Sequence, residues 1–167
     1  MRVAALFTRP SSVYGALGAD CFDAARDARS FDLSCPVVAH PPCRAWGKLS
    51  HFSKPRADER DLSWFALWVV RHCGGVLEHP ASSRLWKEAG IRAGERDAFG
   101  GLLVVVDQAA YGHRAQKRTG LYLVGCSLVP LVAWAAASHF VEKMGRAERE
   151  RTPLALATAL YLAAGSV

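Results

Sequence analysis

Short apolar segments that alternate with helical or polar stretches are the feature that most limits the folds open to this chain. They occur at residues 2–7, 20–23, 35–39, 76–78, 102–106 and 120–125. Strands that are separated by helices or long connections favour a mainly parallel sheet that is covered on both faces. The sequence therefore predicts one α/β domain over residues 1–167, built as a three-layer, Rossmann-like sheet of mostly parallel strands with helices on both faces.

Helices are expected between these segments and after the last of them. The clearest one spans residues 59–73, where apolar side chains recur at helical spacing and two glycines follow. Shorter helices are expected at 11–17 and 83–87, each with a serine that can cap its first turn. A final helix is expected from Thr152 to about Ala163, because Thr-Pro is a common helix start.

Two strongly apolar segments lead to separate predictions. Residues 102–106, Leu-Leu-Val-Val-Val, are apolar on both faces, which predicts a central parallel strand. Residues 121–137 are shorter than the ~20 residues of a membrane-spanning helix, and Gly125 and Pro130 interrupt them. A buried strand followed by a turn explains this second segment better, so no membrane association is predicted.

Charge and cysteine content indicate a partner and a compartment. The chain has 21 Lys and Arg against 15 Asp and Glu, and its net charge of +6 favours a phosphate-bearing partner such as a nucleic acid or a nucleotide. Five scattered cysteines, with no secretory signal at the amino terminus, predict free thiols in a reducing cytoplasm. Because no Cys-x-x-Cys pair occurs, no zinc site is predicted.

The loop Pro41-Pro42-Cys43 is the most probable chemical centre of the chain. It follows the apolar segment 35–39 directly, and ligands of parallel sheets bind beyond the carboxyl ends of the strands. Glu78 and Asp107 also stand at or just after predicted strand ends. These three positions are therefore expected to converge on one site.

The thiol of Cys43 allows two interpretations. Two prolines hold it stiffly, and the neighbouring Arg44 can favour the thiolate, which is the form that attacks electrophiles. The same features suit a structural thiol in a rigid turn. The residues themselves leave both interpretations open.

Three motifs occur in a fixed order along the chain. They are His40-Pro41-Pro42-Cys43 after a strand, Leu77-Glu78-His79-Pro80 at a strand end, and Gln116-Lys117-Arg118 before the strand 120–125. This order resembles the catalytic core of the DNA cytosine C5-methyltransferases. That family has a Pro-Pro-Cys nucleophile loop, a Glu-Asn-Val strand end, and a Gln-x-Arg-x-Arg segment before a strand that ends in glycine. The resemblance implies a methyltransferase-type sheet.

The resemblance also implies a chemistry for these residues. Cys43 would add to C6 of a pyrimidine, Glu78 would hydrogen-bond N3 and the exocyclic group, and Arg118 would bind phosphate or position the base. C5 would then take a methyl group from S-adenosylmethionine, and a target base in duplex DNA would be flipped out of the stack. Further substrate contacts are expected at Pro42, Arg44, Trp46 and Gln116, and cofactor contacts at Asp23 and Pro41.

Each assignment has a plain structural alternative. Glu78 could pair with Arg84 or Arg44 on the surface, and the basic segment 116–118 could be a solvated loop. Trp46, like most tryptophans, could belong to the core.

The chain departs from the family at two places. Residues 6–10, Leu-Phe-Thr-Arg-Pro, stand where the family has its glycine-rich cofactor loop, and the stretch between Gly125 and Arg146 is too short for a target-recognition domain. The leading hypothesis is a minimal methyltransferase-like enzyme for DNA or a pyrimidine nucleotide, with a protein partner that could supply target recognition. The alternatives are a catalytically inactive DNA-binding or regulatory protein of the same fold, and a cysteine enzyme with another one-carbon donor or none.

Overall fold

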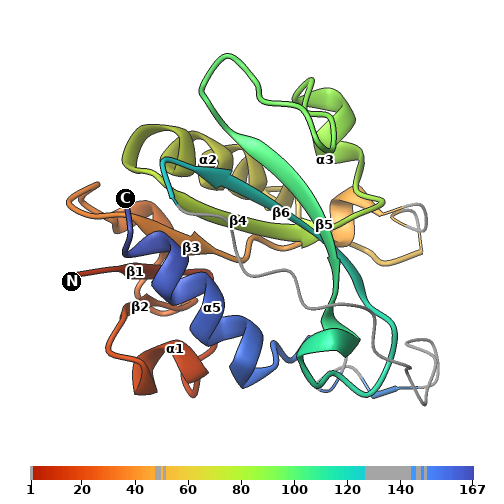
Figure 1. The fold of residues 1–167 in the computed structure, drawn as a ribbon. Helices are drawn as coiled ribbons and strands as arrows, with labels where there is room; N and C mark the ends of the chain where they lie inside the picture. Colours follow the sequence, from red (N-terminus) through yellow and green to blue (C-terminus); the bar gives the residue numbers. More distant parts are fainter. Residues whose placement is uncertain (1, 48–49, 51, 127–143, 146–147, 149) are drawn as a thin grey trace.

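A six-stranded sheet with helices against it forms the centre of the molecule (Figure 1). The structure is a computed structural model, and it describes residues 2–47, 50, 52–126, 144–145, 148 and 150–167. The strands are β1 (Ala4–Leu6), β2 (Asp20–Phe22), β3 (Val37–Ala39), β4 (Gly75–Pro80), β5 (Leu102–Asp107) and β6 (Arg118–Val124). The helices are α1 (Val13–Ala16), α2 (Glu59–Cys73), α3 (Arg84–Glu88) and α5 (Leu154–Ala164), with 3₁₀ turns η1 (Ala28–Ser30), η2 (Arg44–Trp46) and η3 (Gln108–Tyr111). The predicted α/β class is confirmed.

The strand order β2-β1-β3-β4-β6-β5 brings three strand ends together. β1 pairs in parallel with β2 and β3, and β3 pairs in parallel with β4. The register aligns Leu6 with Ala39, and Ala39 with Leu77. His40 and Glu78, which follow the last two of these residues, therefore lie at one edge of the sheet.

The prediction of a central parallel strand at 102–106 is wrong. β5 is the last strand in the order, and it pairs antiparallel with β6, which is also antiparallel to β4. Val105 is 37% exposed, whereas Leu103 and Val106 are buried. Leu103 and Val106 point to opposite faces and belong to the two different apolar clusters, and burial on both faces does not reveal how many strands flank a strand.

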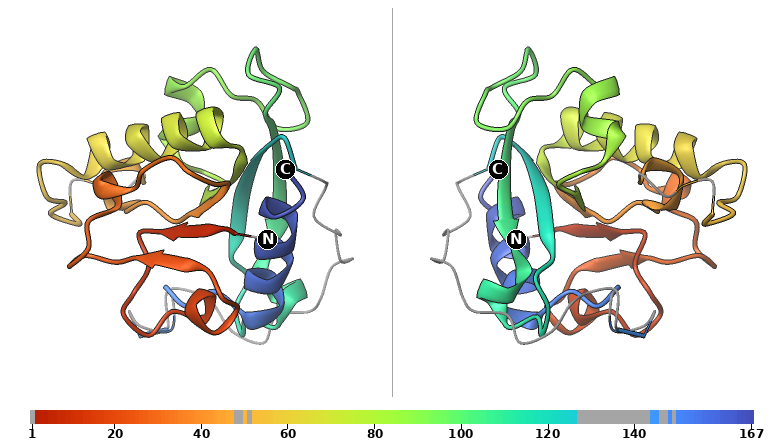
Figure 2. Two further views of the ribbon diagram at one scale, coloured as in Figure 1. Left: turned by 90° about the vertical axis from the view of Figure 1, so that its left-hand side faces the viewer. Right: turned by 90° about the vertical axis from the view of Figure 1, so that its right-hand side faces the viewer.

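Apolar side chains cover the two faces of the sheet in two separate clusters. In one cluster, Leu67 and Val70 of α2 share the core with Leu6 of β1. In the other, Leu156 and Leu160 of α5 pack with residues of the opposite face. Successive strand residues point to opposite faces, so a short strand such as β1 contributes to both clusters. Figure 2 shows α2 and α5 on opposite sides of the sheet.

The helix ends follow local signals, with one exception. α2 spans the predicted residues and stops at Gly74, which has a φ of 77°. Ser12 and Ser83 cap α1 and α3 through their side chains, as expected. α5 begins after Pro153 without a side-chain cap, so Thr152 does not have the predicted role.

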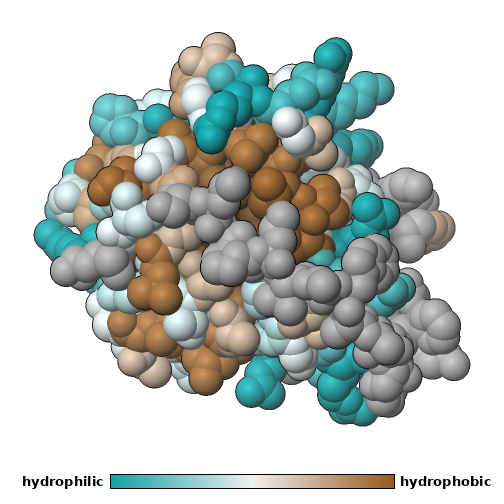
Figure 3. Space-filling view, viewed as in Figure 1, coloured by the Kyte–Doolittle hydropathy of each residue, from teal (hydrophilic) through white to brown (hydrophobic). Residues whose placement is uncertain are grey.

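The face that carries α5 also presents apolar side chains to the solvent (Figure 3). Leu154 and Leu162 of this helix are 62% and 58% exposed. In the part of the chain that the structure describes, no helix is long and apolar enough to cross a membrane. Most of the predicted apolar segment 121–137 lies outside the described residues.

Candidate active site

A pocket of about 800 Å³ opens at the sheet edge where β1, β3 and β4 bring their following residues together. Its volume lies within the range of roughly 300–1,000 Å³ that is usual for small-molecule sites. The predicted site residues that line it are Asp23, Pro41, Pro42, Cys43, Arg44 and Glu78. The structure thus gathers residues that are far apart in the sequence into one cavity.

Trp46 does not face this pocket. The 3₁₀ turn η2 directs its ring into the core, where it is fully buried and its Nε1 donates a hydrogen bond to Ser63 Oγ at 2.8 Å. Arg60 lies over the ring, with its guanidinium carbon 4.2 Å from the ring centroid. The predicted stacking of Trp46 on a base is therefore incompatible with this structure, and the core alternative holds.

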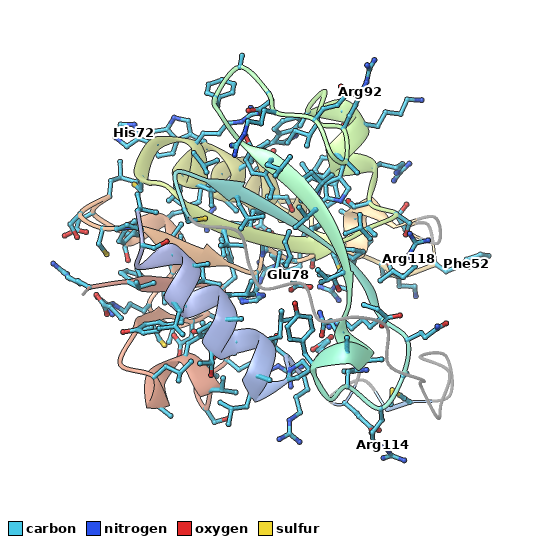
Figure 4. The ribbon with its side chains drawn as sticks, in the orientation of Figure 1. Phe52, His72, Glu78, Arg92, Arg114 and Arg118 are labelled. Atoms are coloured by element: carbon cyan, nitrogen blue, oxygen red, sulfur yellow. The ribbon has the colours of Figure 1, made fainter. Side chains whose placement is uncertain are left out.

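Gln116 and Arg118 are exposed and lie outside the pocket lining, whereas Lys117 between them lines it. Figure 4 shows Glu78 in the interior and Arg118 at the periphery of the molecule. Neighbouring residues at the start of a strand point in opposite directions, so one cation of this segment faces the pocket and the next faces away. Side chains two residues apart in a strand point to the same side, and Thr119 is buried. This spacing would have identified Lys117, two residues earlier, as the cation that faces the pocket.

Glu78 is the centre of a chain of hydrogen bonds. Its Oε2 lies 2.8 Å from His40 Nδ1, and its Oε1 accepts a hydrogen bond from Gln108 Nε2 at 3.1 Å. Further out, His40 Nε2 lies 2.9 Å from the hydroxyl of Tyr14. Gln108 also donates to Thr119 Oγ1 at 2.9 Å. Both carboxylate oxygens are therefore held in place from opposite sides.

The surroundings keep Glu78 ionised. Burial disfavours its charge and is the largest single influence, but the hydrogen bond and the charge of His40 outweigh it. Lys117 and His79 act in the same direction as His40, and together they lower the pKa of Glu78 to about 2. The surface pairs considered from the sequence do not form, since Arg44 pairs with Glu59 and Arg84 donates to Ser50 Oγ and a backbone carbonyl.

The thiol of Cys43 is open to the pocket but is not activated. It is exposed, and it directly precedes η2. Desolvation by the pocket walls, followed by the charge of Glu78, raises its pKa, and Lys117 only partly offsets this. Arg44 does not stabilise the thiolate as expected, because its guanidinium pairs with the carboxylate of Glu59. Cys43 must therefore lose its proton as it reacts.

Sequence reasoning assigned no role to several residues of this site. The sequence places His40 in the proline loop close to Cys35 and Cys43, where no zinc site is predicted, and it places Tyr14 in a predicted helix. Gln108 follows Asp107, which was singled out because of its place at a strand end. Asp107 instead caps η3 by accepting from Ala109 N, and it accepts a second hydrogen bond from Lys117 N. The buried side chain that reaches Glu78 is that of Gln108.

The turn after β1 has features of a ligand-binding loop although it lacks glycines. Phe7 adopts a φ of 62°, a left-handed conformation that glycine normally occupies, and such strain concentrates at functional sites. Thr8 also lines the pocket, and its side chain forms a hydrogen bond with the thiol of Cys21. Asp23 uses one carboxylate oxygen, Oδ1, to accept from the backbone of Ala25 and Arg26 at 3.0 Å each, which fixes its side chain at the pocket.

His79 presents a neutral imidazole to the same pocket. The side chain is buried, and burial is the main reason that its pKa falls to about 4. A backbone hydrogen bond with Pro42 and the charge of Glu78 act on this pKa in the opposite direction, and the ring packs edge-on against Trp86, with the ring centroids 5.9 Å apart. Among the residues that the structure describes, no group of three or more His, Cys, Asp or Glu is arranged to hold a metal ion.

Glu78 is expected to stabilise the fold in a pH-dependent way. Its pKa is depressed from 4.5 to about 2, so its contribution is complete above pH 4.5 and is lost as the pH falls toward 2. A shift of this size corresponds to a stabilisation on the order of 3 kcal/mol. Urea titrations of the wild type and of Glu78→Gln should show a stability difference that shrinks by about that amount over this pH range. A difference that stays constant would contradict the assignment.

No protein-family model matches this chain, and no curated protein matches it significantly. The pocket and its residues must therefore carry any assignment of function.

Proposed function

We propose that the chain is a DNA cytosine C5-methyltransferase-like enzyme that modifies a pyrimidine at C5 through a covalent adduct with Cys43, with S-adenosylmethionine as the methyl donor. One observation supports this most strongly. A thiol, Cys43, and an ionised carboxylate, Glu78, line one pocket together with a second carboxylate, Asp23, at the end of the neighbouring strand β2. Such a reaction needs a nucleophile, a group that hydrogen-bonds the base, and a group that binds the ribose of the cofactor.

The sheet is consistent with a methyltransferase-type, mostly parallel fold. β1 to β4 run in one direction, and β5 shares that direction because it is antiparallel to β6, which is antiparallel to β4. One reversed strand near the edge leaves the carboxyl ends of the others on one side. The pocket lies on that side, which is where the ligands of mostly parallel sheets bind. The proposal therefore includes this sheet type.

The residues at the turn after β1 favour a bound cofactor. Phe7 supplies the left-handed backbone that glycine would supply, and the polar side chains of Thr8 and Asp23 line the pocket beside it. When bound, S-adenosylmethionine would supply the methyl group. Thr8 and Asp23 would hold it, with the carboxylate placed to accept hydrogen bonds from ribose hydroxyls.

The protein groups would act on the pyrimidine in sequence. As the Sγ of Cys43 bonds to C6, its proton would pass to solvent water in the pocket, and electron density would move toward C5 and N3 of the ring. Glu78, as an acceptor, would hold the exocyclic amino group of the base, and a proton taken up at N3 from solvent would neutralise the charge that develops there. Once C5 carries the methyl group, solvent water would take the C5 proton, and the electron pair left behind would expel the Cys43 thiolate from C6 and restore the aromatic ring. A base in duplex DNA would first have to leave the stack.

A nucleic acid or a nucleotide fits the charges at the pocket. Lys117 and Arg151 line it, and neither forms an ion pair with a carboxylate in the described part of the chain. Such cations can bind phosphate groups. The stretch between Gly125 and Arg146 is short, so target selection would then require a protein partner.

The proposal is tested by trapping. Wild-type protein, S-adenosylmethionine and single-stranded DNA that contains 5-fluorocytosine should form a complex that survives denaturation, because fluorine at C5 blocks the final elimination. Intact mass spectrometry should show the added mass of the methylated DNA strand. If no 5-fluoropyrimidine substrate is trapped with the cofactor present, the proposed enzymatic function is refuted. Salt-sensitive DNA binding without an adduct and without heat of cofactor binding would support the inactive DNA-binding alternative.

A further inference from the structure

Four consecutive backbone carbonyls in the loop around Cys43 each accept a hydrogen bond from a different residue. The donors come from α2, from the loop itself, from the segment that follows it, and from α3. The bonds are Ser63 Oγ to Pro42 O at 3.2 Å, Trp46 N to Cys43 O at 3.0 Å, Ser53 Oγ to Arg44 O at 3.1 Å, and Arg84 Nη2 to Ala45 O at 3.1 Å. The backbone of the loop is thus held from several sides, although the side chain of Cys43 is exposed.

Two of these bonds restrain the peptide groups on either side of Cys43. A peptide group is planar, so a hydrogen bond to its carbonyl oxygen restrains the orientation of the whole group. The Pro42 carbonyl belongs to the group before the Cα of Cys43, and the Cys43 carbonyl belongs to the group after it. When both groups are held, the direction of the Cα–Cβ bond is set, and Sγ can move only by rotation between staggered rotamers.

Ser63 is the α2 residue that holds the first of these peptide groups. It is fully buried, and its Oγ accepts a hydrogen bond from Trp46 Nε1 at 2.8 Å. Its single hydroxyl hydrogen is therefore available to a carbonyl, and both Pro42 O at 3.2 Å and Glu59 O at 3.3 Å lie within reach. Glu59, one turn earlier on α2, pairs through its carboxylate with Arg44. Two successive turns of α2 thus hold the loop before and after the thiol.

The pocket wall supplies another contact to the same peptide group. The buried ring of His79 forms a backbone hydrogen bond with Pro42, which must use the carbonyl because proline has no N–H. His79 lines the pocket, whereas Ser63 lies outside the pocket lining. A change at Ser63 therefore alters the support of the loop without altering a group that a ligand would touch.

We propose that Ser63 is a positioning residue for Cys43, because it directs the thiol into the pocket by holding the Pro42 carbonyl. This inference rests on the proposed function, in which Sγ bonds to C6 of a pyrimidine. Such a step requires the reacting atoms to be aligned at about 3–3.5 Å, and a small displacement of the nucleophile slows it strongly. α2 would then serve the reaction as well as the packing of the sheet, without any contact to the base.

Ser63→Ala is expected to slow adduct formation with 5-fluorocytosine DNA. The change removes the donor to the Pro42 carbonyl and the acceptor for Trp46 Nε1, so the loop around Cys43 becomes less restrained. With saturating DNA and S-adenosylmethionine, the rate constant of trapping should fall about tenfold. The Kd for the DNA should change by less than about twofold, because the interaction that is lost acts on the reacting geometry and not on binding.

The same variant is expected to react faster with iodoacetamide near pH 7.5. In the wild type, desolvation and then the charge of Glu78 raise the pKa of the Cys43 thiol, while Glu150 acts in the same direction and Lys117 opposes them. A less restrained loop admits water to Sγ, which lowers this pKa and increases the fraction of reactive thiolate. Mass spectrometry of digested samples follows each thiol separately. The midpoint of the pH profile for Cys43 should move to lower pH, and buried Cys35 should react as in the wild type.

Two further variants separate positioning from a general loss of stability. Val70→Ala is the matched control, because Val70 is buried on α2 about two turns beyond Ser63. It removes buried apolar volume from the same helix and should leave both rates unchanged. Ser53→Ala is the second test if Ser63→Ala does not fold, since it removes only the bond to the Arg44 carbonyl. It should change both rates in the same directions as Ser63→Ala, by smaller factors.

The outcomes separate this inference from the proposed function. Slower trapping together with faster alkylation in Ser63→Ala, with Val70→Ala unchanged, supports the positioning role. Unchanged rates in Ser63→Ala, or the same changes in Val70→Ala, would overturn it even if the wild type is trapped. If the wild type forms no adduct, the proposed function fails, and the alkylation rates still decide whether Ser63 controls the thiol.

Discussion

Cys43→Ala is expected to abolish the covalent complex with 5-fluorocytosine DNA completely. The adduct requires a sulfur that bonds to C6, and no other cysteine lines the pocket within the described residues. The side chain is exposed, so its loss should change the free energy of unfolding by no more than about 0.5 kcal/mol. A denaturing gel of the trapped complex and a thermal melt of the same preparation measure both effects.

Cys21→Ala is the matched control for this variant. Cys21 lies on β2, is half-buried and has a pKa that burial raises, as it does for Cys43. It lies outside the pocket lining, so its replacement should leave trapping intact. An adduct that persists in Cys43→Ala, or that is lost in both variants, would show that Cys43 is not the nucleophile. The structural interpretation of the Pro41-Pro42-Cys43 loop would then be preferred.

Gly75→Ala is expected to destabilise the fold by more than about 3 kcal/mol. An added Cβ would lie 2.0 Å from the carbonyl oxygen of Val37 and 2.7 Å from its nitrogen. The residue also has a φ of 112°, which an L side chain rarely adopts. Because Val37 and Gly75 are paired in the parallel register of β3 and β4, the clash cannot be relieved without separating the two strands. Chemical denaturation, monitored by circular dichroism, measures the decrease in the free energy of unfolding.

Gly94→Ala is the control for backbone strain alone. Gly94 has a φ of 81°, and an added Cβ would meet no atom within 4 Å. Its replacement should therefore cost only about 1 kcal/mol. Equal decreases in the free energy of unfolding of the two variants would mean that the close approach of β3 and β4 is not required for stability. In that case the alignment of His40 with Glu78 would have another origin.

The local elements were largely predictable from the chain itself. α2 begins and ends where the apolar spacing and the two glycines indicate, and Ser12 and Ser83 cap their helices. These features depend on neighbours a few residues away, which periodicity and capping preferences report directly. The order of the strands in the sheet was harder to predict from the sequence. β5 is as apolar as a central strand, but hydrophobicity reports burial on the faces and not pairing along the edges.

The sequence by itself determined that Cys43 follows one strand, that Glu78 stands near the end of another, and that the two could meet at one end of a sheet. Which of their neighbours join them was decided by the tertiary structure. Trp46, three residues from Cys43, turns into the core, and Lys117 faces the pocket while Arg118 faces away. His40 reaches Glu78 across 38 residues of sequence because the parallel register of β3 and β4 places them side by side. The charge of Glu78 depends on that contact, since a carboxylate that is buried without a partner would tend to be neutral.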